Sequence, residues 1–245
     1  MISKNQIKHI RQLEMKKFRQ REGMFVAEGP KVVGDLLKAG YLPVETYATE
    51  GFQETSLTIQ SITQEELRKI SFLQHPQQVL AVFPIPSQKP CSPQLTGHLS
   101  LALDGVQDPG NLGTIVRIAD WFGISTIFCS EDTADAWNPK VVQATMGSIA
   151  RVNIIYTSLA DLISQATVPV YGTLLDGNDI YRQPLSSEGI IVMGNEGNGI
   201  SPEIRQFITR RLLIPSFRQG DTAESLNVAI ATAITCSEFR RRELI

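Results

Sequence analysis

Cysteine and histidine are scarce in this chain of 245 residues. The three cysteines, Cys91, Cys129 and Cys236, are odd in number and far apart, which argues against a disulfide framework. They indicate reduced thiols in a cytoplasmic protein. The three histidines are equally scattered, and none has the ligand spacing of a zinc site or another metal site. We therefore expect no bound metal.

Long hydrophobic runs are also missing. No apolar stretch approaches the length that a membrane span requires, and the basic N-terminus MISKNQIKHIRQ is not followed by an apolar signal core. The sequence therefore predicts neither membrane insertion nor export. The net charge of −2 excludes no partner by itself. The length is sufficient for a substantial apolar core in one large domain or two modest ones.

Positive charge is concentrated near the N-terminus. Residues 4–21 contain seven lysines or arginines and a single acidic residue, Glu14. A local basic segment on an otherwise balanced protein is typical of a nucleic-acid contact. It is equally typical of the solvated face of a helix. The segment alone leaves both interpretations open.

Proline marks a boundary within the chain. Residues 1–83 show a basic helix over 3–20, with Ser3 as its N-cap, followed by strands and helices of a small α/β domain. Residues 84–98 contain four prolines separated by polar residues, which is typical of a linker. We therefore predict domains at 1–83 and 99–245, joined by a linker at 84–98.

Strand and helix patterns alternate after the linker. Apolar strand-like runs begin near residues 99, 125, 150, 169, 189 and 210. Helical patterns are expected at 112–122, 138–149, 158–166 and 202–209, and in a long helix from Ser225. This alternation predicts a mainly parallel sheet with helices on both faces. Because ligands bind beyond the carboxyl ends of such strands, the loops at 104–114, 194–200 and 215–225 are candidate site segments.

The first of these loops lies in LALDGVQDPGNLGTIVRIADWFGI, residues 101–124. Its glycines do not follow the G-x-G-x-x-G order of a dinucleotide fold, and no G-K-[ST] of a P-loop is present. The loop therefore argues against a nicotinamide-dependent oxidoreductase. The polar residues Asn111 and Arg117 could face a ligand at the loop. Alternatively, Asn111 caps the helix and Arg117 pairs with an acid such as Asp120.

The second and third loops are also polar. Three glycines surround Glu196 in MGNEGNGIS, which favours either close backbone approach to a ligand or a tight turn. In the third loop we expect Ser225 as a helix N-cap, with Asn227 in the first turn, where asparagine is uncommon. The three loops bring together no histidine, cysteine nucleophile or metal set, which argues against hydrolase triads and metalloenzymes. The guanidinium of Arg117 and the side-chain amides of Asn111 and Asn227 are suited to binding an anion or orienting a hydroxyl group.

Three stretches of the chain resemble the motifs of one enzyme family. DGVQDPGNLGTIVRIADWFGI, IVMGNEGNGIS and LLIPSFRQGDTAESLNVAIATAI, in this order, are similar to the three motifs of the SpoU/TrmH family of RNA ribose 2'-O-methyltransferases, in the SPOUT superfamily. Upstream, FVAEGPKVV and HPQQVLAV resemble the small RNA-substrate-binding domain of many members. The resemblance implies S-adenosylmethionine as methyl donor, a C-terminal trefoil knot and a homodimer formed through the catalytic domain.

The resemblance also implies residue roles. The positions that match catalytic residues of the family are Asn111, Arg117, Ser225 and Asn227. The cofactor would be held by Gly194, Ile214 and Leu226, largely through backbone groups, with Glu196 supporting the site. If the protein acts on RNA, the charge of the basic N-terminal helix predicts that Lys16, Lys17 and Arg19 contact RNA phosphate. The segment before Ser225 is a few residues longer than in the commonest form of the family and carries Arg218 and Asp221.

Two functions remain open from the sequence. The first is methyl transfer to a ribose 2'-hydroxyl, and the N-terminal domain favours ribosomal over transfer RNA as the substrate. Arg117 would then assist deprotonation of the hydroxyl or hold the neighbouring phosphate. The second is a non-catalytic RNA-binding protein that keeps the fold. A degenerate member of that kind is expected to have lost Asn111, Arg117 or Asn227, and all three are present.

Overall fold

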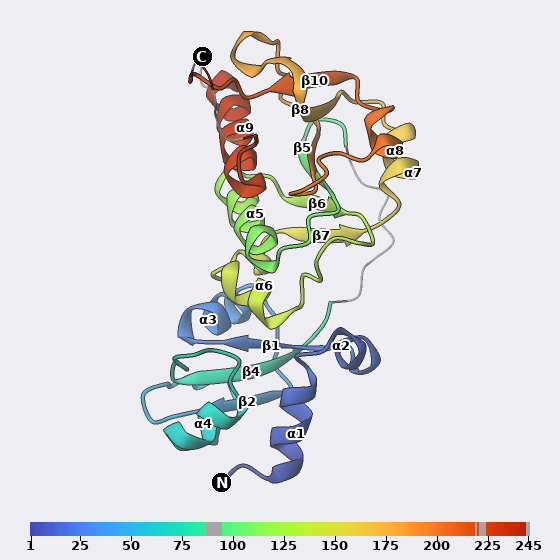
Figure 1. Cartoon of the computed structure of the whole chain (residues 1–245). Coiled ribbons are helices and arrows are strands. Elements are labelled where there is room, and N and C mark those ends of the chain that lie inside the picture. The colour runs from blue at the N-terminus through green and yellow to red at the C-terminus, as the bar shows by residue number, and fades with distance from the viewer. Residues whose placement is uncertain (87–94, 219, 221–223, 244–245) are drawn as a thin grey trace. The chain divides into compact units, whose positions relative to one another are not determined.

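The computed structural model describes residues 1–86, 95–218, 220 and 224–243 (Figure 1). Contacts divide these residues into an N-terminal unit, 1–86 with 135–151, and a C-terminal unit, 95–134 with 152–243. This grouping differs from the expected continuous domain at 99–245, because residues 135–151 pack with the N-terminal unit. Cys91, Asp221 and residues 87–94 of the expected linker lie outside the described residues.

The N-terminal unit is built on a four-stranded sheet in the order β1-β4-β2-β3. Strand β4 is antiparallel to both of its neighbours, and β2 and β3 are parallel. The strands are β1 (Met24–Glu28), β2 (Glu45–Ala48), β3 (Gln60–Ser61) and β4 (Val79–Pro84). The helices are α1 (Lys4–Gln12), α2 (Lys16–Glu22), α3 (Pro30–Lys38), α4 (Gln64–Ile70), α6 (Pro139–Ala144) and the 3₁₀ turn η1 (Ser148–Ala150).

Apolar side chains attach these helices to the sheet. Ile10 of α1 and Leu67 of α4 belong to one buried cluster with Val26 of β1. Alternate residues of a strand face opposite sides of a sheet, so Phe25 lies on the other side, where its ring packs against Trp137, with centroids 4.6 Å apart. The N-terminal unit therefore has apolar packing on both faces of its sheet.

The single basic helix expected over 3–20 is two helices. Ser3 caps α1 as predicted, with its hydroxyl accepting a hydrogen bond from the Gln6 backbone. The chain becomes extended at Met15, which precedes α2. This break allows the buried Arg19 side chain to donate to the carbonyl oxygens of Leu13 and Glu14, at 2.8 and 2.6 Å. These two carbonyls would otherwise end α1 without a partner.

The C-terminal unit contains a six-stranded sheet in the order β10-β8-β9-β5-β6-β7, and every pair of neighbouring strands in it is parallel. The strands are β5 (Leu99–Asp104), β6 (Thr126–Cys129), β7 (Asn153–Tyr156), β8 (Val170–Asp179), β9 (Gly189–Gly194) and β10 (Arg210–Leu213). The predicted parallel sheet is thus confirmed. The residues of β5 are all buried, as expected for a strand covered on both faces.

Helices cover both faces of this sheet. Figure 1 shows α5 and α9 along one face and α7 and α8 on the other. Their bounds are α5 (Pro109–Trp121), α7 (Leu159–Ser164), α8 (Pro202–Arg205) and α9 (Val228–Glu243), with a 3₁₀ turn η2 (Ile180–Arg182). Parallel strands end at a common edge, so the segments after β5, β9 and β10 emerge together. No helix of the described chain is long and apolar enough to span a bilayer.

Candidate functional site

Two polar side chains at strand ends join the loop after β5 to the loop after β9. The Asp104 carboxylate accepts a hydrogen bond from the Ser201 backbone at 2.7 Å. Asn195 donates from its amide to the Gly105 carbonyl, also at 2.7 Å. The Asn195 side-chain oxygen accepts from two backbone N–H groups of its own loop. These bonds fix the β9 loop against the β5 loop without any contribution from a ligand.

Glu196 makes a further connection between these two loops. Its carboxylate accepts hydrogen bonds from the backbones of Gln107 and Asp108, both at 3.3 Å, and from the Asn111 amide at 2.9 Å. Partial burial raises the pKa of Glu196, but these hydrogen bonds outweigh burial and leave the pKa below its usual value. Glu196 is therefore an anion at neutral pH and anchors the start of α5.

Asn111 extends this network to the third loop. Its side-chain oxygen accepts a hydrogen bond from the Asn227 amide at 2.9 Å. The Asn227 side-chain oxygen accepts from the backbones of Ala229 and Ile230, at 2.9 and 3.3 Å. Glu196, Asn111 and Asn227 thus form a continuous chain of hydrogen bonds, the amide chain, across all three predicted loops.

Two capping assignments made from the sequence are wrong. Helix α9 begins at Val228, and its N-cap is Asn227 rather than Ser225. Helix α5 begins at Pro109, and its N-cap is Asp108, whose carboxylate accepts from the Asn111 backbone at 2.8 Å. Because Asp108 provides the cap, the Asn111 side chain is available for the amide chain.

The glycines of the β9 loop allow the chain to approach itself closely. A Cβ atom on Gly194 would lie 2.2 Å from the Gly199 carbonyl carbon, so no side chain fits there. Gly199 has a φ of +68°, a conformation that glycine adopts readily. The tight-turn interpretation therefore accounts for these two positions. It also leaves Glu196 on a narrow loop that faces the start of α5.

The cofactor candidates Ile214 and Leu226 and the catalytic candidate Ser225 lie between β10 and α9. Ile214 is half-buried directly after β10, and Ser225 is exposed. The apolar side chain of Leu226 is 49% exposed, next to Asn227 of the amide chain. The hydrogen bonds among described residues do not include the Ser225 side chain. An exposed apolar group beside polar loop backbones suits a ligand with both apolar and polar parts.

Arg117 does not join the amide chain. A helix turns about 100° per residue, so Arg117 lies roughly 120° around α5 from Asn111 and roughly 9 Å further along it. It belongs instead to an exposed stripe of α5, made up of Gly110, Thr114, Arg117 and Trp121. No hydrogen bond or ion pair links it to another described residue, so the alternative pairing with Asp120 is not observed. Its charge is available to a ligand or partner.

The predicted RNA contacts have different environments. Lys16 and Lys17 are exposed on α2. Arg19 is 1% exposed, and its guanidinium pairs with Asp135 while also donating to two backbone carbonyls. The prediction that Arg19 contacts phosphate is therefore wrong, because all of this guanidinium's described contacts are internal to the N-terminal unit. Sequence analysis could not distinguish these three basic residues.

Sequence analysis also missed Asp104 and Asn195, which connect the loops. Both could have been found by their place in the sequence, since each is a polar residue at or directly after an apolar strand that ends at the predicted site. Within the described part of the chain, no group of three or more histidine, cysteine, aspartate or glutamate side chains could hold a metal ion.

Comparisons with known proteins identify the class to which this fold and site belong. Residues 98–237 match the SpoU rRNA methylase family, and residues 4–81 match the MRM3-like substrate binding domain. The chain belongs to the SpoU rRNA methylase family.

Individual relatives cover nearly the whole chain. It is 31% identical over 97% of its length to the 23S rRNA (guanosine(2553)-2'-O)-methyltransferase RlmP of Bacillus subtilis, of which 97% is covered. Among solved structures, it is similar to a putative RNA methyltransferase of the TrmH family from Porphyromonas gingivalis, with 43% identity, a TM-score of 0.88 and 99% of both chains covered. It is also similar to an AdoMet-bound rRNA methyltransferase from Sinorhizobium meliloti, with 32% identity, a TM-score of 0.86 and 99% and 97% covered.

Proposed function

We propose that this protein transfers the methyl group of S-adenosylmethionine to the ribose 2'-hydroxyl of a nucleotide in ribosomal RNA. The observation that carries the proposal is the amide chain, which joins Glu196, Asn111 and Asn227 across the three loops that match the family motifs. A relative named as a 23S rRNA 2'-O-methyltransferase, which matches 97% of the chain, supports the substrate class.

The cofactor fits the β9 loop and the segment between β10 and α9. Gly194, Ile214 and Leu226 would hold it, largely through backbone groups, and Glu196 would support the loop from the opposite side. The exposed apolar surface of Leu226 suits the adenine ring, and the polar loop backbones suit the ribose and the amino-acid end. When bound, S-adenosylmethionine supplies an electrophilic methyl group on its sulfonium centre.

The residues of this chain would bind and orient the RNA hydroxyl. A ribose hydroxyl is a weak acid, so negative charge grows on its oxygen as it loses its proton and attacks. The Arg117 guanidinium is permanently charged and would stabilise that oxygen or hold the adjacent phosphate. Ser225 provides a further hydroxyl in the loop that precedes α9. We assign the amide chain a positioning role, because the hydrogen bonds of Asn111 already engage both ends of its amide.

The test is single-turnover methylation of RNA by an Arg117→Ala variant. We expect methyl transfer to be abolished while the affinity for S-adenosylmethionine stays close to that of the wild type, since Arg117 makes no contact that organises the loops. The matched control is Arg182→Ala, which removes another exposed arginine of the same unit. Full activity of the Arg117 variant would contradict the role assigned to this residue.

The competing candidate is a non-catalytic RNA-binding protein with the same fold. Calorimetry with S-adenosylmethionine separates the two functions, because absence of detectable binding to the wild type would favour the second.

Mapping 2'-O-methyl groups in total RNA from a strain lacking this protein would identify the methylated nucleotide. Loss of a modification from transfer RNA rather than ribosomal RNA would contradict the proposed substrate.

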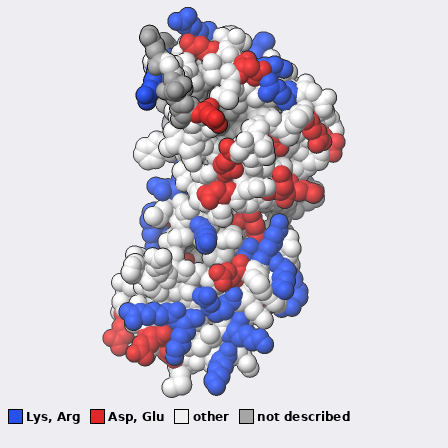
Figure 2. All heavy atoms as spheres, in the orientation of Figure 1, with Lys and Arg blue, Asp and Glu red and all other residues white. Residues whose placement is uncertain are grey.

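We also propose that the N-terminal unit contacts RNA through Lys16 and Lys17. Figure 2 shows lysine and arginine side chains gathered over this unit on the visible face. Around Phe18, Lys17 and Arg21 place their charged groups 5.0 and 4.7 Å from the ring centroid. Basic side chains beside an aromatic ring suit both phosphate and base contacts.

Three further properties are proposed from the resemblance. A homodimer would form through the C-terminal unit, and Trp121 at the end of α5 supports this because its large apolar side chain is 85% exposed. The trefoil knot is supported by the likeness to TrmH-family structures over the whole chain.

A cytoplasmic location is supported by the free, buried thiols of Cys129 and Cys236. Burial raises the pKa of Cys236 to about 12, which keeps this thiol protonated and unreactive.

A further inference from the structure

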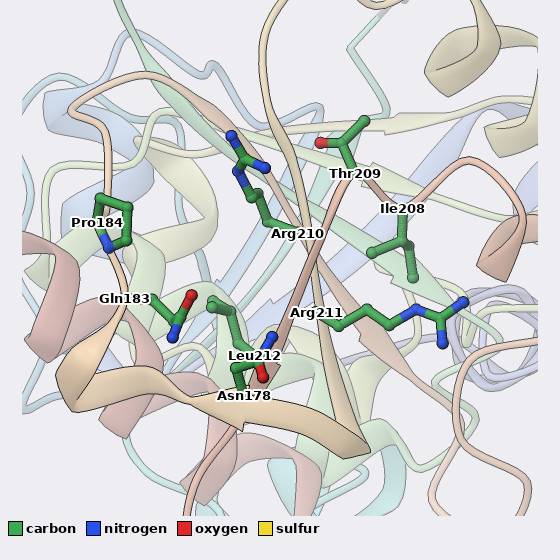
Figure 3. Close-up of a pocket in the computed structure, with 8 residues that line it drawn as sticks. All are labelled: Asn178, Gln183, Pro184, Ile208, Thr209, Arg210, Arg211 and Leu212. Carbon is green, nitrogen blue, oxygen red and sulfur yellow. The ribbon is translucent and has the colours of Figure 1, made fainter.

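A polar pocket in the C-terminal unit lies along β10, the strand at one edge of the sheet (Figure 3). Its volume is about 290 Å³. None of its lining residues belongs to the amide chain or to the residues proposed to hold the cofactor. The polar side chains that line it are those of Asn178, Gln183, Thr209, Arg210 and Arg211.

The pocket arises where the pairing of β10 with β8 is interrupted. Arg211 pairs with Gly172, but the next residue, Leu212, pairs with Asn178. Residues 173–177 of β8 therefore have no partner in β10. After this unpaired stretch, β8 lies against β10 again at Gly177. The two backbones are so close there that a Cβ atom on Gly177 would lie 2.5 Å from the Leu212 carbonyl carbon. The renewed pairing places Asn178 beside β10. Gln183, which follows η2, lines the same pocket.

The lining contains two guanidinium groups and two amides but no carboxylate. Arg211 is partly neutralised, because Asp176 lies 3.2 Å from its Nη1 atom. Thr209 uses its hydroxyl to bond the backbone of Val170. The charge and the hydrogen-bond donors of the pocket therefore come mainly from the other three polar side chains.

These three, Arg210, Asn178 and Gln183, make no side-chain hydrogen bond or ion pair to any described residue. Figure 3 shows Asn178 and Gln183 on the side of the β10 segment toward which Arg210 extends, whereas Arg211 extends to the opposite side. This agrees with the alternation of side chains along a strand. One unpaired guanidinium and two unpaired, neutral amides therefore line one pocket.

We propose that this pocket binds a backbone phosphate of the RNA substrate. A guanidinium presents two parallel N–H groups that match two phosphate oxygens, so Arg210 would take the phosphate. The side-chain amides of Asn178 and Gln183 would hold the adjoining phosphate or ribose oxygens. The pocket volume is roughly ten times the volume that one molecule occupies in liquid water. This size suits a phosphate with its ribose better than a bare ion.

The inference rests on the proposed function, because it takes RNA as the ligand. Phosphate contacts position a nucleic acid without reading its sequence. The pocket would therefore add affinity for many RNA sequences alike. It would not select the methylated nucleotide.

The experiment measures binding of a structured ribosomal RNA fragment to the full chain over a range of salt concentrations. For Arg210→Gln we expect the dependence of log affinity on log salt to become shallower by about one, as for the loss of one phosphate contact. Affinity at low salt should fall roughly tenfold. The matched control is Arg182→Gln, an arginine of η2 that is 85% exposed and does not line the pocket. It should bind like the wild type.

The outcomes separate this inference from the proposed function. If Arg210→Gln keeps the wild-type affinity and salt dependence, the pocket assignment is overturned, whether or not the wild type methylates RNA. If the wild type fails to methylate RNA but Arg210→Gln still weakens RNA binding, the proposed function fails and the inference stands. Inorganic phosphate is the remaining probe. If it stabilises the wild type against heat through Arg210 while RNA affinity is unchanged in the variant, the pocket takes free phosphate and not RNA.

Discussion

At the scale of single residues, Asn111 shows how one side chain can connect three loops. Its amide nitrogen donates to Glu196 and its oxygen accepts from Asn227. Both ends of the amide are thus occupied without a ligand. A substrate hydroxyl that approached Asn111 would have to share or displace one of these bonds. We infer that Asn111 contributes mainly by holding the other two residues in place.

Glu196 is the charged member of this network and can be tested by Glu196→Gln. The substitution removes the charge and replaces one accepting oxygen by a donor that faces other donors. Loss of one hydrogen bond to a charged group costs about 1.5 kcal/mol, or roughly tenfold in affinity for S-adenosylmethionine measured by calorimetry. The matched control is Glu203→Gln, which alters an exposed acid of α8 and should leave affinity unchanged.

The same variant should change the pH dependence of cofactor binding. The folded-state pKa of Glu196 is lowered, so its stabilising effect is fully present above the ordinary carboxyl pKa and is lost as pH falls through the folded value. Cofactor affinity of the wild type should therefore hold at neutral pH and decline at acid pH. Glu196→Gln should be weaker at neutral pH and lack this decline. An identical pH profile for both proteins would contradict the anchoring role.

At the scale of secondary structure elements, Arg19 connects α2 to the segment 135–151. Its Nε atom lies 3.1 Å from Asp135 Oδ2, and its Nη1 atom donates to the end of α1. Removing one partner of a buried ion pair leaves an uncompensated charge, at a cost of about 3 kcal/mol. Arg19→Met should therefore lower the melting temperature by roughly 6–12 °C, as measured by calorimetry.

The exposed lysines of α2 are expected to respond to substitution in the opposite way to the buried Arg19. A Lys16→Ala, Lys17→Ala double variant should melt like the wild type, because neither side chain is buried. It should bind RNA more weakly, with a shallower salt dependence. The opposite pattern, in which Arg19→Met weakens RNA binding without loss of stability, would restore the sequence-based assignment of Arg19. If the salt dependence of RNA binding is unchanged in the double variant, this face of α2 is exposed to solvent and does not contact RNA.

At the scale of the whole molecule, the end of α5 that carries Trp121 is the surface that a second copy of the chain would cover. Trp121 is 85% exposed, and tryptophan is prominent among residues that dominate protein interfaces. Trp121→Glu should therefore convert the proposed dimer to a monomer in sedimentation experiments. The control is Leu42→Glu, which changes an apolar side chain of the N-terminal unit that is 73% exposed. A monomeric wild type would refute the dimer, and a dimeric Trp121 variant would place the interface elsewhere.

Much of the fold could be predicted because its signals are local. Apolar runs such as Leu99–Asp104 and Gly189–Gly194 form buried strands where the pattern predicts them. The alternation of these runs with helical segments predicts a parallel sheet. Boundaries were less predictable, because they depend on which polar residue makes the cap. Asp108 and Asn227 cap α5 and α9, where other residues were expected.

The sequence by itself determined the class of fold, the three loops at one edge of the sheet, and the resemblance that identified the family. These features follow from hydrophobic periodicity and from residues close together in the chain. Only the tertiary structure decided that Glu196, Asn111 and Asn227 bond to one another, that Arg19 is buried beside Asp135, and that residues 135–151 pack with the N-terminal unit. Each of these depends on contacts between residues far apart in the sequence, which local patterns do not encode.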